Sequence, residues 1–293
     1  MPISIAYLGP SGTYSEMAVL VCADWLAASQ DLEYLPQLSP YPSIVQALYA
    51  VAEQQSQLAV VPVENSIEGG VGVTLDTVWQ LNQLQIQQAL VLPISHALLS
   101  CAAGTEQIQT VYSHPQALAQ CQGWLTQHLP SAQLIPTHST TESLQHLKQS
   151  STAAAVASQR AAQLYQLPIL AYPINDHPDN CTRFWVLGLS ESNVGSHTSL
   201  AFSLPANRPG GLVSALQVFA ERSLNLSRIE SRPSKRSLGD YLFFVDIEAS
   251  IQSAAVQAAI QELKQYSETL KLFGSYSIKF AELTPTPPRG LLP

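Results

Sequence analysis

The feature that most constrains the fold is an alternation of short apolar runs with helical stripes along most of the chain. Residues 3–8 and 58–63 are predicted to be buried strands, and residues 44–52 carry apolar side chains at helical spacing. The alternation continues to residue 171, with strands near 86–92, 109–113, 133–135 and 153–157 and helices between and after them. This order predicts an α/β fold with buried parallel strands.

Length and charge limit what such a chain can do. At 293 residues it is too long for one ordinary small core, so we expect two units, one of them bilobed. The net charge of −8 argues against nucleic acid or an anionic membrane surface as a partner. Met1-Pro2 leads straight into the first strand without a cleavable signal, and the most apolar run, 89–104, is too short and polar to span a bilayer. We therefore expect a cytoplasmic protein.

The cysteines give no support for a metal site. Cys22, Cys101, Cys121 and Cys181 are scattered without C-x-x-C or Cys/His ligand spacing, and the seven histidines show no paired spacing. We expect reduced thiols that pack as small apolar groups. Cys181 would be a nucleophile only with a histidine partner, which the sequence does not supply.

The turn at 9–13, after the first strand, is the first candidate binding element. Thr13 and Glu16 have capping-box spacing, which predicts a helix that starts near Tyr14. Backbone N–H groups of Ser11-Gly12-Thr13 would then lie at the positive end of a helix and suit a carboxylate or phosphate. The turn lacks the Walker and G-x-G-x-x-G patterns, which disfavours nucleotides. A plain tight turn is the equally weighted alternative.

Two later strand ends also carry polar groups. Glu64-Asn65 begin a turn that runs to Gly70, at the carboxyl end of a strand, where α/β folds bind ligands. Ser113 stands at another strand exit, and Gln120 lies about a turn and a half along the helix that follows Pro115. The alternative is structural: Asn65 organises a turn, Ser113 caps a helix and Gln120 is solvated.

The stretch Asn180-Cys181-Thr182-Arg183-Phe184 places a hydroxyl beside a fixed cation at the start of a predicted buried strand. Because guanidinium binds carboxylates through two parallel hydrogen bonds, a small acidic substrate is the first hypothesis. An ordinary exposed Thr-Arg pair is the alternative on this stretch alone.

The character of the chain changes after Gly188. Residues 190–197 are polar and read as a linker. Beyond them, residues 198–280 show a strand, helix, strand, strand, helix, strand order, which predicts a ferredoxin-like layer of helices on an antiparallel sheet. Residues 281–293 are expected to be a loose tail.

Five motifs taken together resemble the monofunctional prephenate dehydratases with a C-terminal ACT regulatory domain. They are Ala6 to Ser15, Val61 to Gly69, Tyr112 to Gln116, Thr182 to Phe184 and Ile229 to Pro233, in that order along the chain. The resemblance implies a catalytic domain over 1–189, similar to periplasmic binding proteins, with one lobe of about 1–78 plus 178–189 and another of 79–177. An ACT domain over 198–280 would follow, and no chorismate mutase domain is expected before Ile3.

The resemblance also implies an activity and its residues. The family converts prephenate to phenylpyruvate, with loss of water and carbon dioxide, in phenylalanine biosynthesis, and needs no cofactor. By resemblance Thr182 is the essential catalytic residue, with Asn65, Ser113 and Gln120 lining the site. We expect the Thr182 hydroxyl to hydrogen-bond the leaving oxygen, because it is too weak an acid to be a full proton donor. The expected substrate-binding residues are Ser11, Gly12, Thr13, Glu64, Arg183 and Phe184, and water or Glu64 would deliver the proton.

Family members with an ACT domain bind L-phenylalanine between paired ACT domains. The expected effector residues here are Asn207, Gly210, Gly211, Leu212, Leu226, Glu230, Ser231 and Arg232. Gly211 departs from the usual Gly-Ala-Leu of that loop, which leaves the effector's identity open. An effector at such an interface implies a homodimer, and relatives also form tetramers. Two alternatives remain: arogenate dehydratase, and a non-catalytic amino-acid sensor.

Overall fold

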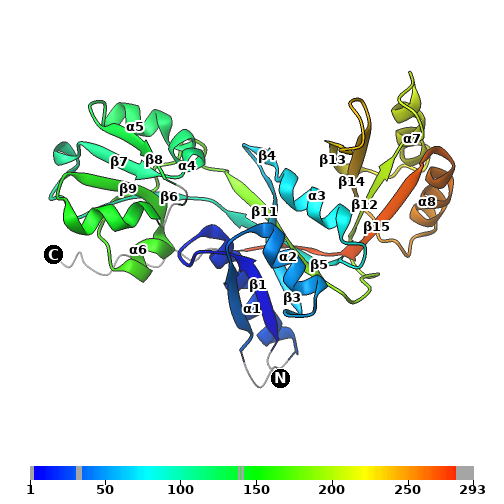
Figure 1. The fold of residues 1–293 in the computed structure, drawn as a ribbon, viewed down its shortest axis with the longest axis horizontal. Helices are drawn as coiled ribbons and strands as arrows, with labels where there is room; N and C mark the ends of the chain where they lie inside the picture. The colour runs from blue at the N-terminus through cyan, green and yellow to red at the C-terminus, as the bar shows by residue number, and fades with distance from the viewer. Residues whose placement is uncertain (1–2, 31–34, 138, 140–141, 282–293) are drawn as a thin grey trace.

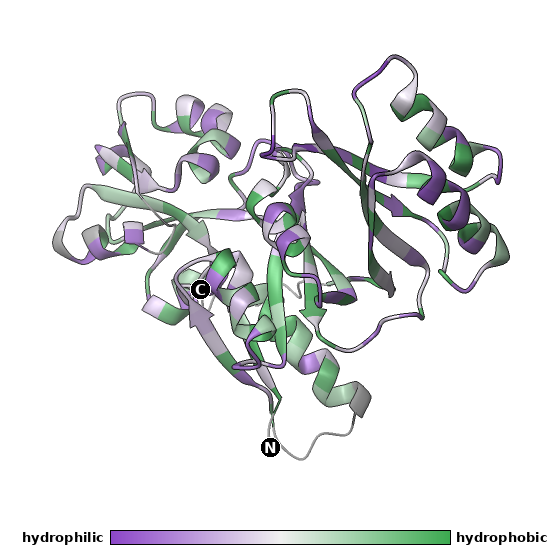
Figure 2. Cartoon of the chain, turned by 45° about the vertical axis from the view of Figure 1, so that its right-hand side comes forward, coloured by the Kyte–Doolittle hydropathy of each residue, from purple (hydrophilic) through white to green (hydrophobic). Residues whose placement is uncertain are grey.

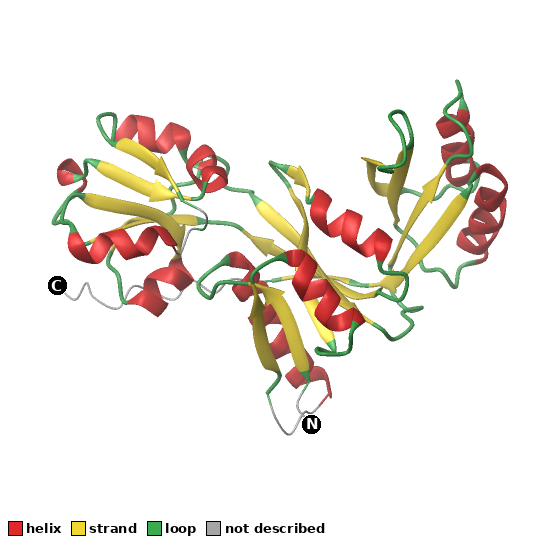
Figure 3. Ribbon diagram, viewed as in Figure 1, coloured by secondary structure: helices red, strands yellow, loops and turns green. Residues whose placement is uncertain are grey.

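The computed structural model describes residues 3–30, 35–137, 139 and 142–281. Three sheets organise these residues, as Figure 1 and Figure 3 show, with the sheet around β1, β3 and β11 in the middle of the view. Helices pack on all three, so the α/β expectation is confirmed.

The first sheet has the strand order β16-β5-β11-β3-β1-β2, with β4 paired to β3. β1 pairs in parallel with β2 and β3, whereas β11 is antiparallel to both of its neighbours. Helix α1 packs on one face, and α2 and α3 pack on the other. The elements are β1 (Ser4–Leu8), α1 (Tyr14–Gln30), β2 (Gln37–Tyr41), α2 (Ile44–Ala52), β3 (Leu58–Asn65), β4 (Gly69–Gly70), α3 (Gly72–Gln80), β5 (Gln85–Pro93), β11 (Cys181–Gly188) and β16 (Ile278–Phe280).

The second sheet has the order β10-β6-β9-β7-β8, with buried apolar residues on both of its faces. The helix expected after Pro115 is broken at Cys121 into two shorter helices. The elements are β6 (His96–Ser100), the 3₁₀ helix η1 (Thr105–Gln107), β7 (Thr110–Ser113), α4 (Pro115–Gln120), α5 (Gln122–His128), β8 (Gln133–Pro136), the 3₁₀ helix η2 (Glu142–Gln149), β9 (Ala153–Ser158), α6 (Gln159–Tyr165) and β10 (Ile169–Ala171).

The third sheet is antiparallel, in the order β13-β14-β12-β15, and carries two helices on one face. This is the ferredoxin-like arrangement expected from the sequence. The elements are β12 (His197–Ser203), α7 (Gly211–Ala220), β13 (Leu226–Pro233), β14 (Tyr241–Ile247), α8 (Ala254–Tyr266) and β15 (Thr269–Tyr276).

Two elements differ from the expected domain boundaries. β5 pairs with β11 from Gln85 to Pro93, so we propose that the first lobe continues to Pro93 instead of ending near residue 78. The chain also leaves the third sheet after Tyr276, and β16 pairs with β5 in the first sheet. Local hydropathy predicted a strand near 86–92, but it gave no separate strand at 278–280 and carries no information on which sheet receives a strand. Apart from Ala281, the expected tail lies outside the described residues.

One hydrophobic core joins the first and third sheets. Leu242, Phe244 and Phe273 of the third sheet pack in the same cluster as Trp185 of β11 and Leu75 of α3. In Figure 2 the hydrophobic residues gather along the strands of the sheets, while many loops are hydrophilic. The third sheet is therefore packed on its helices by one face and on the first lobe by the other.

Candidate active site

Asn65 and Thr182 are brought together by the pairing of β3 with β11. The antiparallel register sets these two residues opposite each other at the strand ends. Asn65 Nδ2 donates to Thr182 Oγ1 at 2.9 Å, and the two residues are only 6% and 9% exposed. Because side chains alternate along a strand, Thr182 shares its face with Phe184, which is buried in the core beneath α1.

Backbone N–H groups fix which atom donates in the hydrogen bond between Asn65 and Thr182. Asn65 Oδ1 accepts hydrogen bonds from the N–H groups of Ile67 and Glu68, each at 3.0 Å, so its Nδ2 must be the donating end. That nitrogen also donates to Asn180 Oδ1 at 2.9 Å and to the carbonyl of Cys181 at 3.1 Å. Thr182 Oγ1 therefore accepts from Asn65, and among the described residues its own hydrogen has no acceptor. The Thr182 hydroxyl is free to donate to an incoming oxygen.

Gln120 joins the same network from the second lobe. Its Oε1 accepts from Asn180 Nδ2 and lies 3.0 Å from His96 Nε2, and the side chain is 4% exposed. Asn180 thus links Gln120 to Asn65 and Thr182 across the two lobes. Ser113 is fully buried, and its hydroxyl donates to the carbonyl of Val156 at 2.6 Å within the second sheet. No hydrogen bond among the described residues connects Ser113 to the network.

Groups of the turn 9–13 are already hydrogen-bonded to Glu16 in the first turn of α1. The N–H of Gly12 donates to Glu16 Oε2 at 2.8 Å, and Thr13 Oγ1 accepts from the N–H of Glu16 at 3.3 Å. The helix start at Tyr14 and the cap by Thr13 are therefore confirmed, but the Glu16 carboxylate accepts from Gly12 N–H and not from Thr13 N–H as in a full capping box. Ser11 Oγ lies 3.3 Å from the hydroxyl of Tyr7. Because Glu16 already holds the Gly12 donor, this turn presents fewer free N–H groups than the sequence analysis expected.

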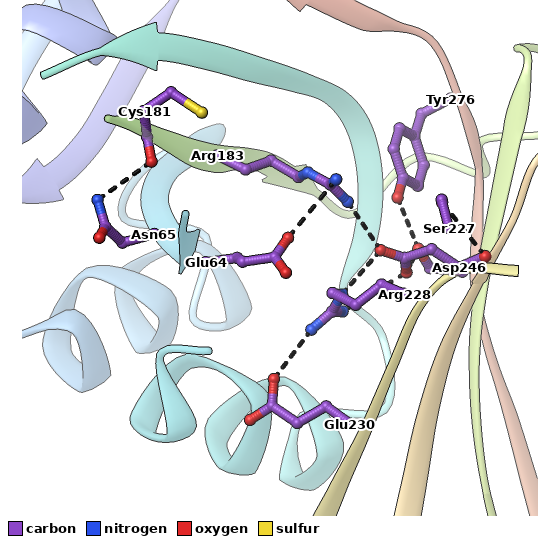
Figure 4. Close-up of polar contacts among 10 residues, drawn as sticks. Glu64, Asn65, Cys181, Arg183, Ser227, Arg228, Glu230, Asp246 and Tyr276 are labelled. Atoms are coloured by element: carbon purple, nitrogen blue, oxygen red, sulfur yellow. Dashed lines mark hydrogen bonds and ion pairs between the residues drawn. The ribbon is translucent and has the colours of Figure 1, made fainter. Parts of the chain in front are cut away.

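Arg183 lies on the face of β11 opposite Thr182, as strand alternation requires. Figure 4 shows its guanidinium between two carboxylates: Glu64 at 3.5 Å and Asp246 of β14 at 3.0 Å. Glu64 is therefore also turned toward the third sheet. This arrangement differs from the expectation that Arg183 and Glu64 lie beside the Thr182 hydroxyl.

Asp246 is the centre of this charged cluster. Its fully buried carboxylate accepts from Arg228 Nε at 2.8 Å, from Arg183 and from Ser199 Oγ. Burial alone would raise the pKa of Asp246, but the charge and hydrogen bonds of Arg228 hold it below the usual value. The cluster continues to Glu230, 3.3 Å from Arg228 (Figure 4).

The expected effector residues occupy two parts of the third sheet. Leu226, Glu230, Ser231 and Arg232 lie on β13, and Arg232 makes two hydrogen bonds of 3.2 Å to Asp76 of α3. A Cβ at Gly70 would overlap the Glu230 carboxylate, so glycine there permits β13 to approach β4. Asn207, Gly210, Gly211 and Leu212 lie at or just before the start of α7.

The departure at position 211 has a small steric consequence. An added Cβ at Gly211 would meet Leu204 Cδ1 at 3.5 Å, an ordinary van der Waals contact. Alanine would therefore fit at this position. Gly210, in contrast, has φ +80°, a conformation that glycine adopts without strain.

Metal-binding clusters and membrane-spanning helices are both absent from the part of the chain that the structure describes. No cluster of three or more His, Cys, Asp or Glu side chains there could hold a metal ion. No helix there has the length and apolar character needed to cross a bilayer.

Three residues of the network were not assigned to the site from the sequence: Asn180, His96 and Tyr14. Asn180 stands two residues before Thr182, so strand periodicity could have suggested that the two share a face. His96 and Tyr14 had no local signal, because what defines them is contact with residues distant in the sequence.

Comparisons with known proteins agree with this architecture. The prephenate dehydratase family matches residues 5–192, and the ACT domain family matches residues 198–265. The bifunctional chorismate mutase/prephenate dehydratase of Aquifex aeolicus (strain VF5) is 40% identical over 276 residues, 94% of this chain and 73% of that protein. The prephenate dehydratase of Lactococcus lactis subsp. cremoris (strain MG1363) is 36% identical over 94% of this chain and 98% of its own length.

A solved structure extends the similarity to three dimensions. The prephenate dehydratase of Arthrobacter aurescens, in complex with L-Phe, superposes with a TM-score of 0.83 at 32% identity. The match covers 97% of this chain and 94% of that one. With its two-lobed catalytic part and ferredoxin-like third sheet, this chain belongs to the prephenate dehydratase family and carries an ACT domain.

Proposed function

We propose that this protein converts prephenate to phenylpyruvate at the Asn65–Thr182 pair. The observation that carries the proposal is the direction of the hydrogen bond in that pair. Asn65 donates and Thr182 accepts, so the Thr182 hydroxyl hydrogen is free at the junction of the two lobes. The family match, which covers residues 5–192, supports the choice of substrate.

The reaction needs one oxygen to leave as one carbon–carbon bond breaks. Loss of the ring carboxylate as carbon dioxide leaves an electron pair that enters the ring, and the ring carbon–oxygen bond breaks to expel hydroxide. The hydroxide takes up a proton and becomes water. Aromatisation drives the step, so the protein needs to stabilise the charge that develops on the departing oxygen.

Thr182 is suited to that task. Its hydroxyl would donate a hydrogen bond to the departing oxygen, while Asn65 holds its lone pair and so fixes the direction of the hydrogen. Glu64 is paired with Arg183 on the opposite face of the sheet, so we assign the proton to solvent water. The buried Phe184 ring below Thr182 makes the surroundings apolar, which favours loss of the carboxylate.

The experiment is a turnover assay of the purified protein with prephenate and, separately, with arogenate. We expect phenylpyruvate from prephenate. Phenylalanine formed only from arogenate would indicate an arogenate dehydratase. No turnover of either substrate would indicate a non-catalytic amino-acid sensor. Thr182→Ala should lower kcat by about 10²-fold or more, whereas Thr182→Ser, which keeps the hydroxyl, should retain much more activity. Near-normal turnover in Thr182→Ala would refute the role of the hydroxyl.

Regulation and assembly belong to the same proposal. We propose L-phenylalanine as the effector of the ACT domain, which the L-Phe complex of the Arthrobacter relative supports. A homodimer through ACT domains, with a tetramer as the further possibility, and a cytoplasmic location stay predictions from the sequence. Inhibition assays with L-phenylalanine test the effector, and light scattering tests the homodimer and the tetramer.

A further inference from the structure

A buried histidine lies behind the proposed active site and has no role so far. His96 is the first residue of β6 and is 2% exposed. Its Nε2 lies 3.0 Å from Gln120 Oε1, and its Nδ1 lies 3.1 Å from the hydroxyl of Tyr14. The Tyr14 ring stands edge-on to the imidazole, with centroids 5.5 Å apart.

The tautomer of His96 follows from the network in front of it. The N–H groups of Ile67 and Glu68 make Asn65 Nδ2 a donor, so Asn180 Oδ1 accepts. Asn180 Nδ2 must then donate, which makes Gln120 Oε1 an acceptor. An acceptor 3.0 Å from His96 Nε2 requires the hydrogen on that nitrogen.

The other ring nitrogen, Nδ1, faces the Tyr14 hydroxyl at 3.1 Å. In a neutral imidazole that carries its hydrogen on Nε2, Nδ1 is an acceptor that the Tyr14 hydroxyl can reach. That hydroxyl has one hydrogen, which it donates to the carbonyl of Ser95 at 2.8 Å, so the contact with Tyr14 does not by itself fix the state of Nδ1, and the assignment rests on the Gln120 side. Burial lowers the pKa of His96, although the hydrogen bond with Gln120 opposes that shift, so the neutral form is the favoured one.

The consequence falls on the other end of Gln120. Because Oε1 is held by two donors, from His96 and Asn180, the amide group cannot rotate without breaking both bonds. Gln120 Nε2 is buried and has no hydrogen-bond partner among the residues that the structure describes. A buried donor left unpaired is unfavourable, and a ligand acceptor would remove that cost.

We propose that His96 is a positioning residue that, as the Nε2–H tautomer, holds Gln120 so that its free Nε2–H donors meet an oxygen of the substrate. The proposal rests on the proposed function, since the substrate is the prephenate of that reaction. His96 itself lies behind Gln120 and does not touch the substrate.

Two substitutions of His96 distinguish the role of its Nε2–H donor from the role of the imidazole ring as a whole. His96→Gln places an amide N–H where Nε2 was, whereas the shorter His96→Asn reaches only the Nδ1 position. We expect kcat/KM for prephenate to fall by about 10- to 100-fold in His96→Asn and to be largely recovered in His96→Gln. His128→Asn, the same change on the exposed end of α5, is the matched control and should behave as wild type.

A double-mutant cycle tests whether His96 acts through Gln120. In a Gln120→Ala background, His96→Asn should cause little further loss, because the group that it positions is already gone. Additive losses would overturn the proposal, as would equal losses in His96→Asn and His96→Gln. Wild-type activity in His96→Asn would do the same.

A measurement without substrate keeps the test independent of the proposed function. Nitrogen-15 spectra of the imidazole in the free wild-type protein should show the hydrogen on Nε2, and the hydrogen on Nδ1 would overturn the proposal. If His96→Asn does not fold, the nitrogen-15 spectrum of the wild type still decides whether the hydrogen lies on Nε2, as the proposal requires. If the wild type does not turn over prephenate, the proposed function fails while the tautomer is still tested.

Discussion

At the scale of single residues, Asn65 decides what Thr182 can do. Its carbonyl oxygen is held by two backbone N–H groups, and its amide nitrogen reaches three acceptors. A threonine hydroxyl alone would rotate and donate to any nearby oxygen. Held by Asn65, it has one lone pair occupied and one hydrogen to offer, which is electrostatic preorganisation on the scale of a single bond.

Replacing Asn65 by aspartate tests this reasoning with a nearly isosteric change. The oxygen that accepts from Ile67 and Glu68 is kept, but the donor becomes an oxygen that faces Thr182 Oγ1 and Asn180 Oδ1. The Thr182 hydroxyl should then turn its hydrogen to the carboxylate, and kcat should fall by about 10²-fold or more. Circular dichroism serves as the folding control. An Asn65→Asp enzyme that works nearly as well as wild type would contradict the polarity argument.

The fold brings some of the residues expected at the site together and leaves others apart, while their roles stay predictions. Asn65 and Thr182 were expected to share a site, and the strand register sets them opposite each other. Arg183 was expected to face a substrate carboxylate, yet it binds Asp246, which lies 63 residues further along the chain. The local sequence shows the cation but not which distant carboxylate will reach it.

At the scale of elements, local patterns predicted most strands and helices but not which sheet they join. The helix at 44–52 lies where hydrophobic spacing placed it, because it has one apolar face to bury. β2, with its Gln, Ser and Pro, had no strand signal, and it is ordered by parallel pairing with β1. The last strand was expected to end near Ile278, so β16 was not predicted as a separate strand, and it pairs with β5.

The placement of β16 predicts that the catalytic part depends on the end of the chain. Ile278 to Phe280 pair with Ala89 to Val91, and Lys279 Nζ lies 3.9 Å from the centre of the Trp25 ring. A chain that ends at Ser277 should therefore melt several degrees below one that ends at Ala281, since each kcal/mol corresponds to about 2–4 °C in a protein of this size. The longer truncation is the control. Equal melting temperatures would show that β16 adds nothing to the first sheet.

At the scale of the whole molecule, the ACT domain and the first lobe are not independent bodies. They share a hydrophobic core, and Asp246 binds both Arg183 of β11 and Arg228 of β13. Arg183 follows Thr182 directly, and Arg228 lies two residues before Glu230, on the expected effector strand. One buried carboxylate therefore joins β11, which carries Thr182, to β13, which carries the expected effector residues (Figure 4).

The last prediction concerns the stability that this carboxylate provides. Asp246→Asn removes the negative charge and leaves two guanidinium groups facing a neutral amide, so the free energy of unfolding should fall by about 3–5 kcal/mol at neutral pH. Asp76→Asn is the matched control, because Asp76 pairs with the more exposed Arg232 and Lys235 and should cost about 1 kcal/mol or less.

The pH dependence of that difference identifies its origin. The folded-state pKa of Asp246 lies below its usual value of 3.8, so its stabilising charge is fully present above the unfolded-state pKa. The contribution is lost as pH falls through the folded-state pKa, where wild type and Asp246→Asn become alike. Chemical denaturation from pH 7 downward should therefore show the difference shrinking below about pH 4. A difference that stays constant with pH would mean that packing, and not charge, joins the two domains at Asp246.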